Sequence, residues 1–124
     1  VEWAADAVLG TVTQPFVLTA LSGEEEEDGV PKAYALGQNV PNPFNPSTTI
    51  SYDVPAGGGN VSLRVYDVSG RLVATLVDGH QTEGVKSVTW DGTGDRGQRV
   101  ASGIYFYRMR APGFGETKKM VLLR

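Results

Sequence analysis

The longest run of aromatic and β-branched residues in the chain is Gly103–Arg110. Alternate positions divide it into two sets, with Tyr105, Tyr107 and Met109 on one side and Ile104, Phe106, Arg108 and Arg110 on the other. A repeat of two residues is typical of a pleated strand and not of a helix. The run therefore predicts a central β-strand, which ends at Pro112-Gly113 because proline lacks the amide that a sheet ladder needs.

Shorter runs of the same kind recur along the chain. They are Thr48–Val54, Asn60–Val68, Arg71–Asp78, Val85–Trp90 and, after a four-residue turn, Thr117–Leu123. The 16 glycines and 7 prolines stand mainly between these runs, where they act as turn signals. Gly103–Arg110 and Thr117–Leu123 together predict a C-terminal β-hairpin. Short strands at this spacing predict an all-β fold, an antiparallel β-sandwich of six to seven strands.

The alternation also predicts which side chains face the core. The inward set is Ile50, Tyr52, Val54, Val61, Leu63, Val65, Val88, Trp90, Tyr105 and Tyr107. Arg71–Asp78 differs from the other strands because it is apolar on both faces. Such a strand is either covered on both sides or leaves a sticky surface.

A proline-rich segment, Pro41–Ser47, precedes the first regular strand. Its three prolines fix the backbone and withhold amide donors, so it predicts a stiff extended arm with turns. Phe44 is the one apolar side chain in its middle, and we expect it to plug one end of the core. The alternative is an exposed recognition aromatic.

The first third of the chain follows a different pattern. Two β-prone runs, Ala7–Thr13 and Phe16–Leu21, come before the consecutive carboxylates of Glu24–Asp28. Adjacent like charges repel and bury nothing, so we interpret the acidic run as a solvated linker. The predicted organisation is an N-terminal β-strand extension over 1–21, an acidic linker over 22–33 and a β-sandwich over 34–124.

Composition excludes several classes of partner. The net charge is −3, which gives no cationic excess to attract a phosphate backbone, so we expect no nucleic acid partner. The chain has no cysteine, which removes disulfides, thiolate nucleophiles and sulfur metal ligands. No apolar run is long enough to span a membrane. Val1 is not an initiator methionine, so we expect a processed or excised product.

The residues that could carry chemistry do not form a catalytic set. His80 is the only histidine, and it falls in a predicted turn. Asp91 and Asp95 share a glycine-rich loop that only loosely resembles a calcium loop, and we favour a turn whose aspartates bond local amides. Weak calcium binding there or at Glu24–Asp28 stays open. The sequence therefore predicts a non-enzyme with no cofactor.

Arg108 and Arg110 fall on one face of their strand, with Lys118 or Lys119 across the hairpin. A basic stripe of this kind is usually protection of a sheet edge. A docking surface is the alternative interpretation.

Four stretches, Leu36–Ile50, Leu63–Arg71, Gly103–Tyr107 and Lys119–Val121, together resemble the C-terminal sorting domain of the type IX secretion system. Trp90–Gly97, followed by Val100 and Gly103, is similar to the Ig-like domain of flagellar hook-capping proteins. The resemblance covers about residues 34–124. It implies an Ig-like sandwich on an exported bacterial protein, read by the outer-membrane export machinery before the cargo is released or attached to the surface.

Two functions follow as expectations, both extracellular or at the cell surface. The first is a sorting or anchoring module, recognised by the export machinery through Lys118, Lys119, Met120, Val121, Leu122, Leu123 and Arg124. The second is a structural subunit of a filament or surface layer that pairs with neighbouring copies through Phe16, Val17, Leu18, Thr19, Ala20 and Leu21. A binding module for glycan or protein is a third class, and the only support for it in the sequence is scattered aromatic residues.

Overall fold

The computed structural model describes residues 29–124, and Ala33–Arg124 form one compact unit. Within this described part every regular element is a strand. The strands are β2 (Ala35–Leu36), β3 (Thr48–Val54), β4 (Gly59–Tyr66), β5 (Leu72–Gln81), β6 (Gly84–Trp90), β7 (Gly103–Ala111) and β8 (Phe114–Leu122). No helix of the described residues has the length and apolar character needed to cross a membrane.

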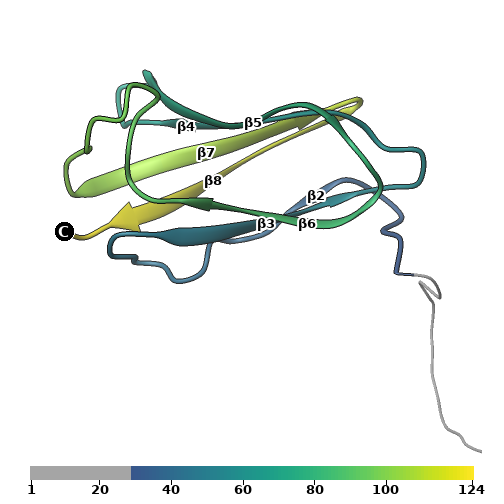
Figure 1. The fold of residues 1–124 in the computed structure, drawn as a ribbon, viewed down its shortest axis with the longest axis horizontal. Helices are drawn as coiled ribbons and strands as arrows, with labels where there is room; N and C mark the ends of the chain where they lie inside the picture. Colours follow the sequence, from purple (N-terminus) through teal and green to yellow (C-terminus); the bar gives the residue numbers. More distant parts are fainter. Residues whose placement is uncertain (1–28) are drawn as a thin grey trace, which may run out of the picture. The chain divides into compact units, whose positions relative to one another are not determined.

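The strands form two antiparallel sheets that lie face to face (Figure 1). The smaller sheet has the order β2-β3-β6, and the larger has the order β5-β4-β7-β8. The prediction of an all-β, Ig-like sandwich of six to seven strands is confirmed, and Gly103–Ala111 is an interior strand of the larger sheet. The short strand β2 was not predicted, because two residues are too few to show a period.

The core lies between the two sheets, and the predicted inward side chains form it. All of them are buried except Val88, which is partly buried against the core. Trp90 is buried in this core, and its ring centroid lies 5.7 Å from that of Phe44 and 5.5 Å from that of Tyr105. Phe44 is 1% exposed, so it plugs the core as expected and is not an exposed recognition aromatic.

The doubly apolar strand is explained by two irregularities in its pairing. The register between β4 and β5 shifts twice, and Leu76 and Val73 are the residues left without a direct partner. An extra residue in one strand interrupts the alternation. Val73 and Ala74, and then Leu76 and Val77, therefore pack consecutively against the same core. Neither predicted outcome holds, because the strand is not covered on both faces and most of its apolar side chains pack on the core.

Two predicted turns were too long. Ala111 pairs directly with Phe114, so Pro112-Gly113 alone makes the hairpin turn and β8 begins earlier than predicted. Gly113 has a φ of 71°, a conformation that glycine adopts easily at the third position of a tight turn. In the same way β5 runs on to Gln81, and His80 pairs with Asn60 in a strand and not in a turn.

Candidate functional site

The predicted recognition segment, Lys118–Arg124, is split between core and surface. Met120 and Leu122 are fully buried in β8, whereas Lys119 and Leu123 are exposed. Lys118 forms an ion pair with Glu116 at 3.1 Å. Alternation along the strand thus leaves Lys119, Val121 and Leu123 on the side away from the core. Deleting the whole segment would remove two core side chains together with any recognition surface.

The outer edge of this segment is covered by the proline-rich arm. The Phe44 amide donates to the Val121 carbonyl at 3.0 Å, and the Leu123 amide donates to the Phe44 carbonyl at 2.9 Å. The Val121 amide donates to Asn42 Oδ1 at 3.0 Å. An uncovered edge strand would be a template for pairing with another chain. The arm removes this template from the last part of β8, so a partner there must read side chains.

The last residue, Arg124, is fastened to the loop between β6 and β7. Its amide donates to Ser102 Oγ at 2.9 Å, and its Nε donates to the Val100 carbonyl at 2.6 Å. Its Nη2 donates to the Gly92 carbonyl, also at 2.6 Å. Hydrogen bonds from a charged donor are stronger than neutral ones. The guanidinium therefore fixes the end of the predicted recognition segment to this loop, and we call this contact the Arg124 clamp.

A buried polar network centred on Asn39 holds the start of the same arm. Asn39 is 1% exposed, and its Nδ2 donates to the Pro41 carbonyl and to Thr48 Oγ1. The backbone amide of Asn39 donates to the Tyr107 hydroxyl, and this hydroxyl donates to the Gly37 carbonyl at 2.7 Å. Burial raises the pKa of Tyr107 to about 12. The arm is thus attached to the core strand β7 through a neutral hydroxyl group.

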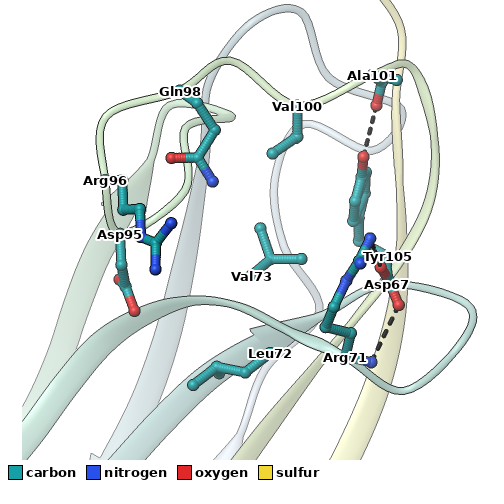
Figure 2. A pocket seen from close by; sticks show the side chains of 10 residues that line it. All are labelled: Asp67, Arg71, Leu72, Val73, Asp95, Arg96, Gln98, Val100, Ala101 and Tyr105. Atoms are coloured by element: carbon teal, nitrogen blue, oxygen red, sulfur yellow. Dashed lines mark hydrogen bonds and ion pairs between the residues drawn. The ribbon is translucent and has the colours of Figure 1, made fainter.

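A second candidate region is a cleft at the end of the sandwich (Figure 2). It has a volume of about 650 Å³ and is lined by Asp67, Arg71, Leu72, Val73, Asp95, Arg96, Gln98, Val100, Ala101 and Tyr105. Val73 and Val100 point toward its middle, and charged side chains surround them. Three of the stretches that carry the family resemblance meet here, from the β4–β5 turn, the β6–β7 loop and the start of β7.

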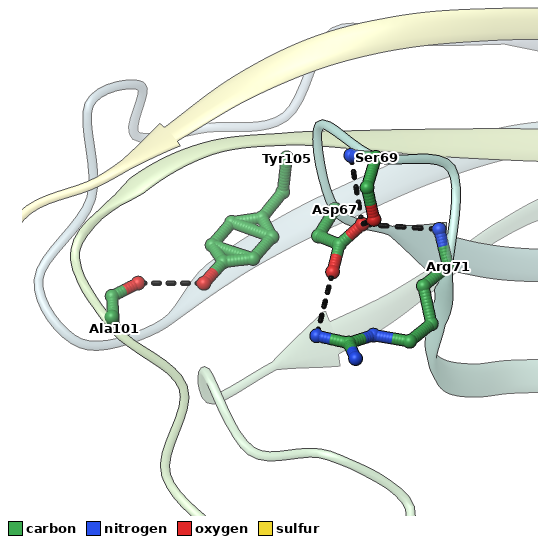
Figure 3. A network of polar contacts seen from close by, with 5 residues as sticks. All are labelled: Asp67, Ser69, Arg71, Ala101 and Tyr105. Carbon is green, nitrogen blue, oxygen red and sulfur yellow. Dashed lines mark hydrogen bonds and ion pairs between the residues drawn. The ribbon is translucent and has the colours of Figure 1, made fainter.

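The β4–β5 turn is organised by one carboxylate (Figure 3). Asp67 Oδ1 accepts bonds from the Ser69 amide, the Ser69 hydroxyl and the Arg71 amide, and Oδ2 pairs with the Arg71 guanidinium at 3.3 Å. The Ser69 hydroxyl and the Arg71 amide hold the pKa of this carboxyl below its ordinary value. Across the cleft Tyr105 donates to the Ala101 carbonyl at 2.6 Å. Asp67 and Tyr105 thus both bond to groups of the adjacent turn and loop.

Of the two aspartates of the glycine-rich loop, Asp91 bonds a local amide as predicted, whereas the prediction is wrong for Asp95, which bonds the amide of a distant strand. Asp91 Oδ1 accepts from the Thr93 amide and hydroxyl, as expected for a turn, and the Thr93 hydroxyl is the main cause that lowers the pKa of Asp91. Asp95 Oδ1 accepts from the Thr75 amide at 2.8 Å, and the Asp95 amide donates to the Val73 carbonyl at 3.0 Å. Asp95 therefore covers part of the β5 edge. The Glu24–Asp28 run and the Phe16–Leu21 run lie outside the described residues.

Two other predicted positions are placed differently from expectation. His80 is exposed on β5 and belongs to no group of three or more possible metal ligands within residues 29–124. Arg108 and Arg110 lie on β7, which has β4 on one side and β8 on the other. The interpretation of these arginines as edge protection is therefore wrong.

Sequence reasoning missed Asn39, Asp95 and Arg124 as residues that organise these regions. Each bonds to a strand or loop distant in sequence, and hydrophobic periodicity carries no information on such contacts. One signal was present for Asn39. It precedes Val40-Pro41, where the arm begins and where buried backbone groups need side-chain partners.

Comparison with known proteins adds a family match and structural likenesses. A family model described as the FlgD Ig-like domain matches residues 41–113. The dimeric latent PorU of Porphyromonas gingivalis resembles the chain with a TM-score of 0.61 and 25% identity, over 80% of the chain and 10% of PorU. The chain thus spans about a tenth of that protein's length. No curated protein sequence matches the chain.

Two further solved structures are similar at lower scores. PorZ of Porphyromonas gingivalis, described as an essential bacterial surface component of the type-IX secretion system, has a TM-score of 0.49 and 29% identity, over 70% of the chain and 11% of PorZ. FlgD of Xanthomonas campestris, described in connection with the hook capping essential for flagellar assembly, has a TM-score of 0.48 and 25% identity, over 74% of the chain and 63% of FlgD.

Proposed function

Because the chain belongs to the FlgD Ig-like domain family, we propose that it is a non-enzymatic module that sorts or anchors an exported bacterial protein. It works outside the cell or at its surface, and its partner is the outer-membrane export machinery. The family match and the likeness to PorU support a bacterial sandwich module. The recognition segment is Lys118–Arg124.

The observation that carries this proposal is the construction of that segment. Its backbone is fixed by the proline-rich arm on one side and by the hydrogen bonds of Arg124 at its end. Lys119 and Leu123 nevertheless remain exposed, and Leu123 is 51% exposed. A rigid backbone that presents a cation and an apolar side chain loses little conformational entropy when a receptor binds it. This geometry supports recognition through exposed side chains and not through strand pairing.

Absence of catalysis is part of the proposal. The polar groups in the cleft at the end of the sandwich bond to turn and loop backbone, as Asp67 and Tyr105 do. A catalytic site needs a nucleophile or base with a positioned partner and space for a substrate. The cleft offers space, but its carboxylates Asp67 and Asp95 are occupied in holding turns and edges.

The sufficiency of the module can be tested by fusion. The chain would be attached to the C-terminus of a periplasmic reporter enzyme in a bacterium with a type IX secretion system. We expect reporter activity at the cell surface or in the medium, and retention in a strain without the outer-membrane translocon. A folded fusion that stays in the periplasm of the competent strain would contradict the proposal.

A structural subunit is the second candidate function, and one edge of the smaller sheet favours it. In the described residues β6 pairs with β3 alone, so its other edge carries no partner strand. Val85 on β6 is 68% exposed. Such an edge can accept a strand from another chain. We propose the Phe16–Leu21 run of a neighbouring copy as that strand.

This second candidate makes a separate prediction. Removing residues 1–21 should leave a folded monomer, whereas the full chain should assemble into filaments visible by electron microscopy. Filaments formed equally by the shortened chain, or a full chain that stays monomeric at high concentration, would exclude this assembly mode.

A further inference from the structure

Three arginines gather on the exposed face of the larger sheet, and we call them the arginine cluster: Arg64, Arg108 and Arg110. Arg64 on β4 lies directly opposite Arg108 on β7 in the register, and Arg110 is two positions further along β7. Their neighbours on the inward side, such as Leu63 and Met109, are fully buried. Alternation therefore turns all three guanidinium groups toward the same outer face.

None of the three arginines forms an ion pair among residues 29–124, although Asp78 on β5 lines a surface pocket together with Arg110. The ion pairs found there are Arg71 with Asp67 and Lys118 with Glu116. Arg64 Nε is buried and makes no hydrogen bond. Like charges directly opposite each other on an antiparallel pair destabilise a sheet. The cluster is thus costly to the isolated fold, and it occurs in a chain whose net charge is −3.

A cavity of about 420 Å³ adjoins the cluster. It is lined by Tyr66, Asp67, Val68, Gly70, Phe106, Arg108, Arg110 and Thr117. Tyr66 and Phe106 lie opposite each other in the register, next to the Arg64–Arg108 pair. Asp67 is the one carboxylate in the lining, and its oxygens are already bound by Ser69 and Arg71. The cavity therefore combines two aromatic side chains with guanidinium groups that form no ion pair with a carboxylate of the described residues.

We propose that this face binds a carboxylate-rich polypeptide segment of a partner protein. Carboxylates accept paired hydrogen bonds from guanidinium groups, and such charge-assisted bonds are among the stronger ones in proteins. The aliphatic and backbone parts of an acidic segment would pack on Tyr66 and Phe106. A patch on an interior strand cannot bind by strand addition, so recognition here runs through side chains. The proposal is independent of the sorting role of Lys118–Arg124.

A fluorescent peptide of residues 22–30 supplies an acidic probe, because it contains the Glu24–Asp28 run. Its binding would be measured by anisotropy at low salt. The full chain would carry E24Q, E25Q, E26Q, E27Q and D28N, so that its own acidic run cannot compete. A control peptide would carry the same neutral substitutions. We expect binding of the acidic peptide only, weakening as salt screens the charges.

Two substituted chains locate the binding site. R108Q with R110Q should weaken binding about tenfold or more, because two guanidinium–carboxylate contacts are lost. K86Q with R99Q removes the same charge from β6 and the β6–β7 loop and should leave binding unchanged. No binding of the acidic peptide, salt-independent binding, or equal weakening by both pairs would overturn the proposal. So would arginine-dependent binding to anionic lipid vesicles or polygalacturonate without binding to the peptide.

Discussion

The side chains on the two faces of the central strands β4 and β7 have different explanations. On the inner face Leu63, Val65 and Tyr107 are fully buried, so their presence is explained by the core. On the outer face Arg64 opposes Arg108, and no contact within the described fold accounts for this pair. One alternating pattern therefore has two outcomes: the inner positions stabilise the fold, and the outer positions place charged side chains away from the core.

The largest expected effect comes from the inner face. Trp90→Ala should lower the free energy of unfolding by about 3–5 kcal/mol, because it leaves a cavity between Phe44 and Tyr105. Thr89→Ala, at an exposed position on the same strand, is the matched control and should change little. Urea denaturation measures both. An unchanged midpoint for the tryptophan variant would show that the assigned core is wrong.

Tyr107→Phe tests the polar part of the inner face. It removes the hydroxyl that serves both the Gly37 carbonyl and the Asn39 amide, so we expect a loss of about 1–3 kcal/mol. Burial raises the pKa of Tyr107 to about 12, above its ordinary value of 10.0. The folded state therefore keeps this proton while the unfolded state loses it, and stability falls as the pH rises from about 10 to 12.

The variant should show a shallower loss of stability over that pH range. Some slope will persist, because burial also raises the pKa of Tyr52 and of Tyr105. Unfolding curves collected at several alkaline pH values give the comparison. Identical slopes for the two chains would contradict the assigned role of the Tyr107 hydroxyl.

A substitution at the edge of β5 should have an intermediate effect on the free energy of unfolding. Asp95→Ala removes the acceptor for the Thr75 amide, at a cost of about 0.5–1.5 kcal/mol. Asp95→Asn retains a side-chain oxygen and should recover most of this loss. If alanine and asparagine destabilise equally, the hydrogen bond does not stabilise the edge.

The smallest effect on stability is expected on the outer face, and its sign is informative. Arg108→Gln removes the repulsion from Arg64 and should raise the free energy of unfolding by about 0.2–1 kcal/mol. Lys86→Gln, which alters a lysine bonded to Thr82, lacks this benefit. A clear loss of stability in the Arg108 variant would mean that the guanidinium has a structural partner.

Much of the fold could be predicted from periodicity alone. The inward residues of β3, β4, β6 and β7 follow a strict alternation, and the family resemblance of the sequence is confirmed by the match over residues 41–113. The pattern was misleading on β5, because two shifts of register place consecutive apolar residues against one core. A bulge is set by the partner strand, which the local sequence does not reveal.

The candidate sites were less predictable because they depend on contacts between distant segments. The Lys118–Arg124 segment was named from the resemblance, yet its cover by Phe44 and its clamp to Gly92 required the assembled fold. The arginine cluster could be predicted from the sequence only in part. Arg108 and Arg110 share a strand, but the position of Arg64 opposite Arg108 depends on the register between β4 and β7. The predicted division of residues 1–33 stays a prediction.

The most direct test of the account compares export and stability in the same surface variants. Lys119→Glu with Leu123→Asp changes the exposed side of the recognition segment and leaves Met120 and Leu122 in the core. Val68→Asp with Arg99→Glu makes the same kinds of change at two other exposed positions. Both should keep the wild-type unfolding midpoint, and only the first should retain the reporter fusion in the periplasm. Normal export of the Lys119–Leu123 variant, with its fold intact, would contradict the claim that this surface is read by the export machinery.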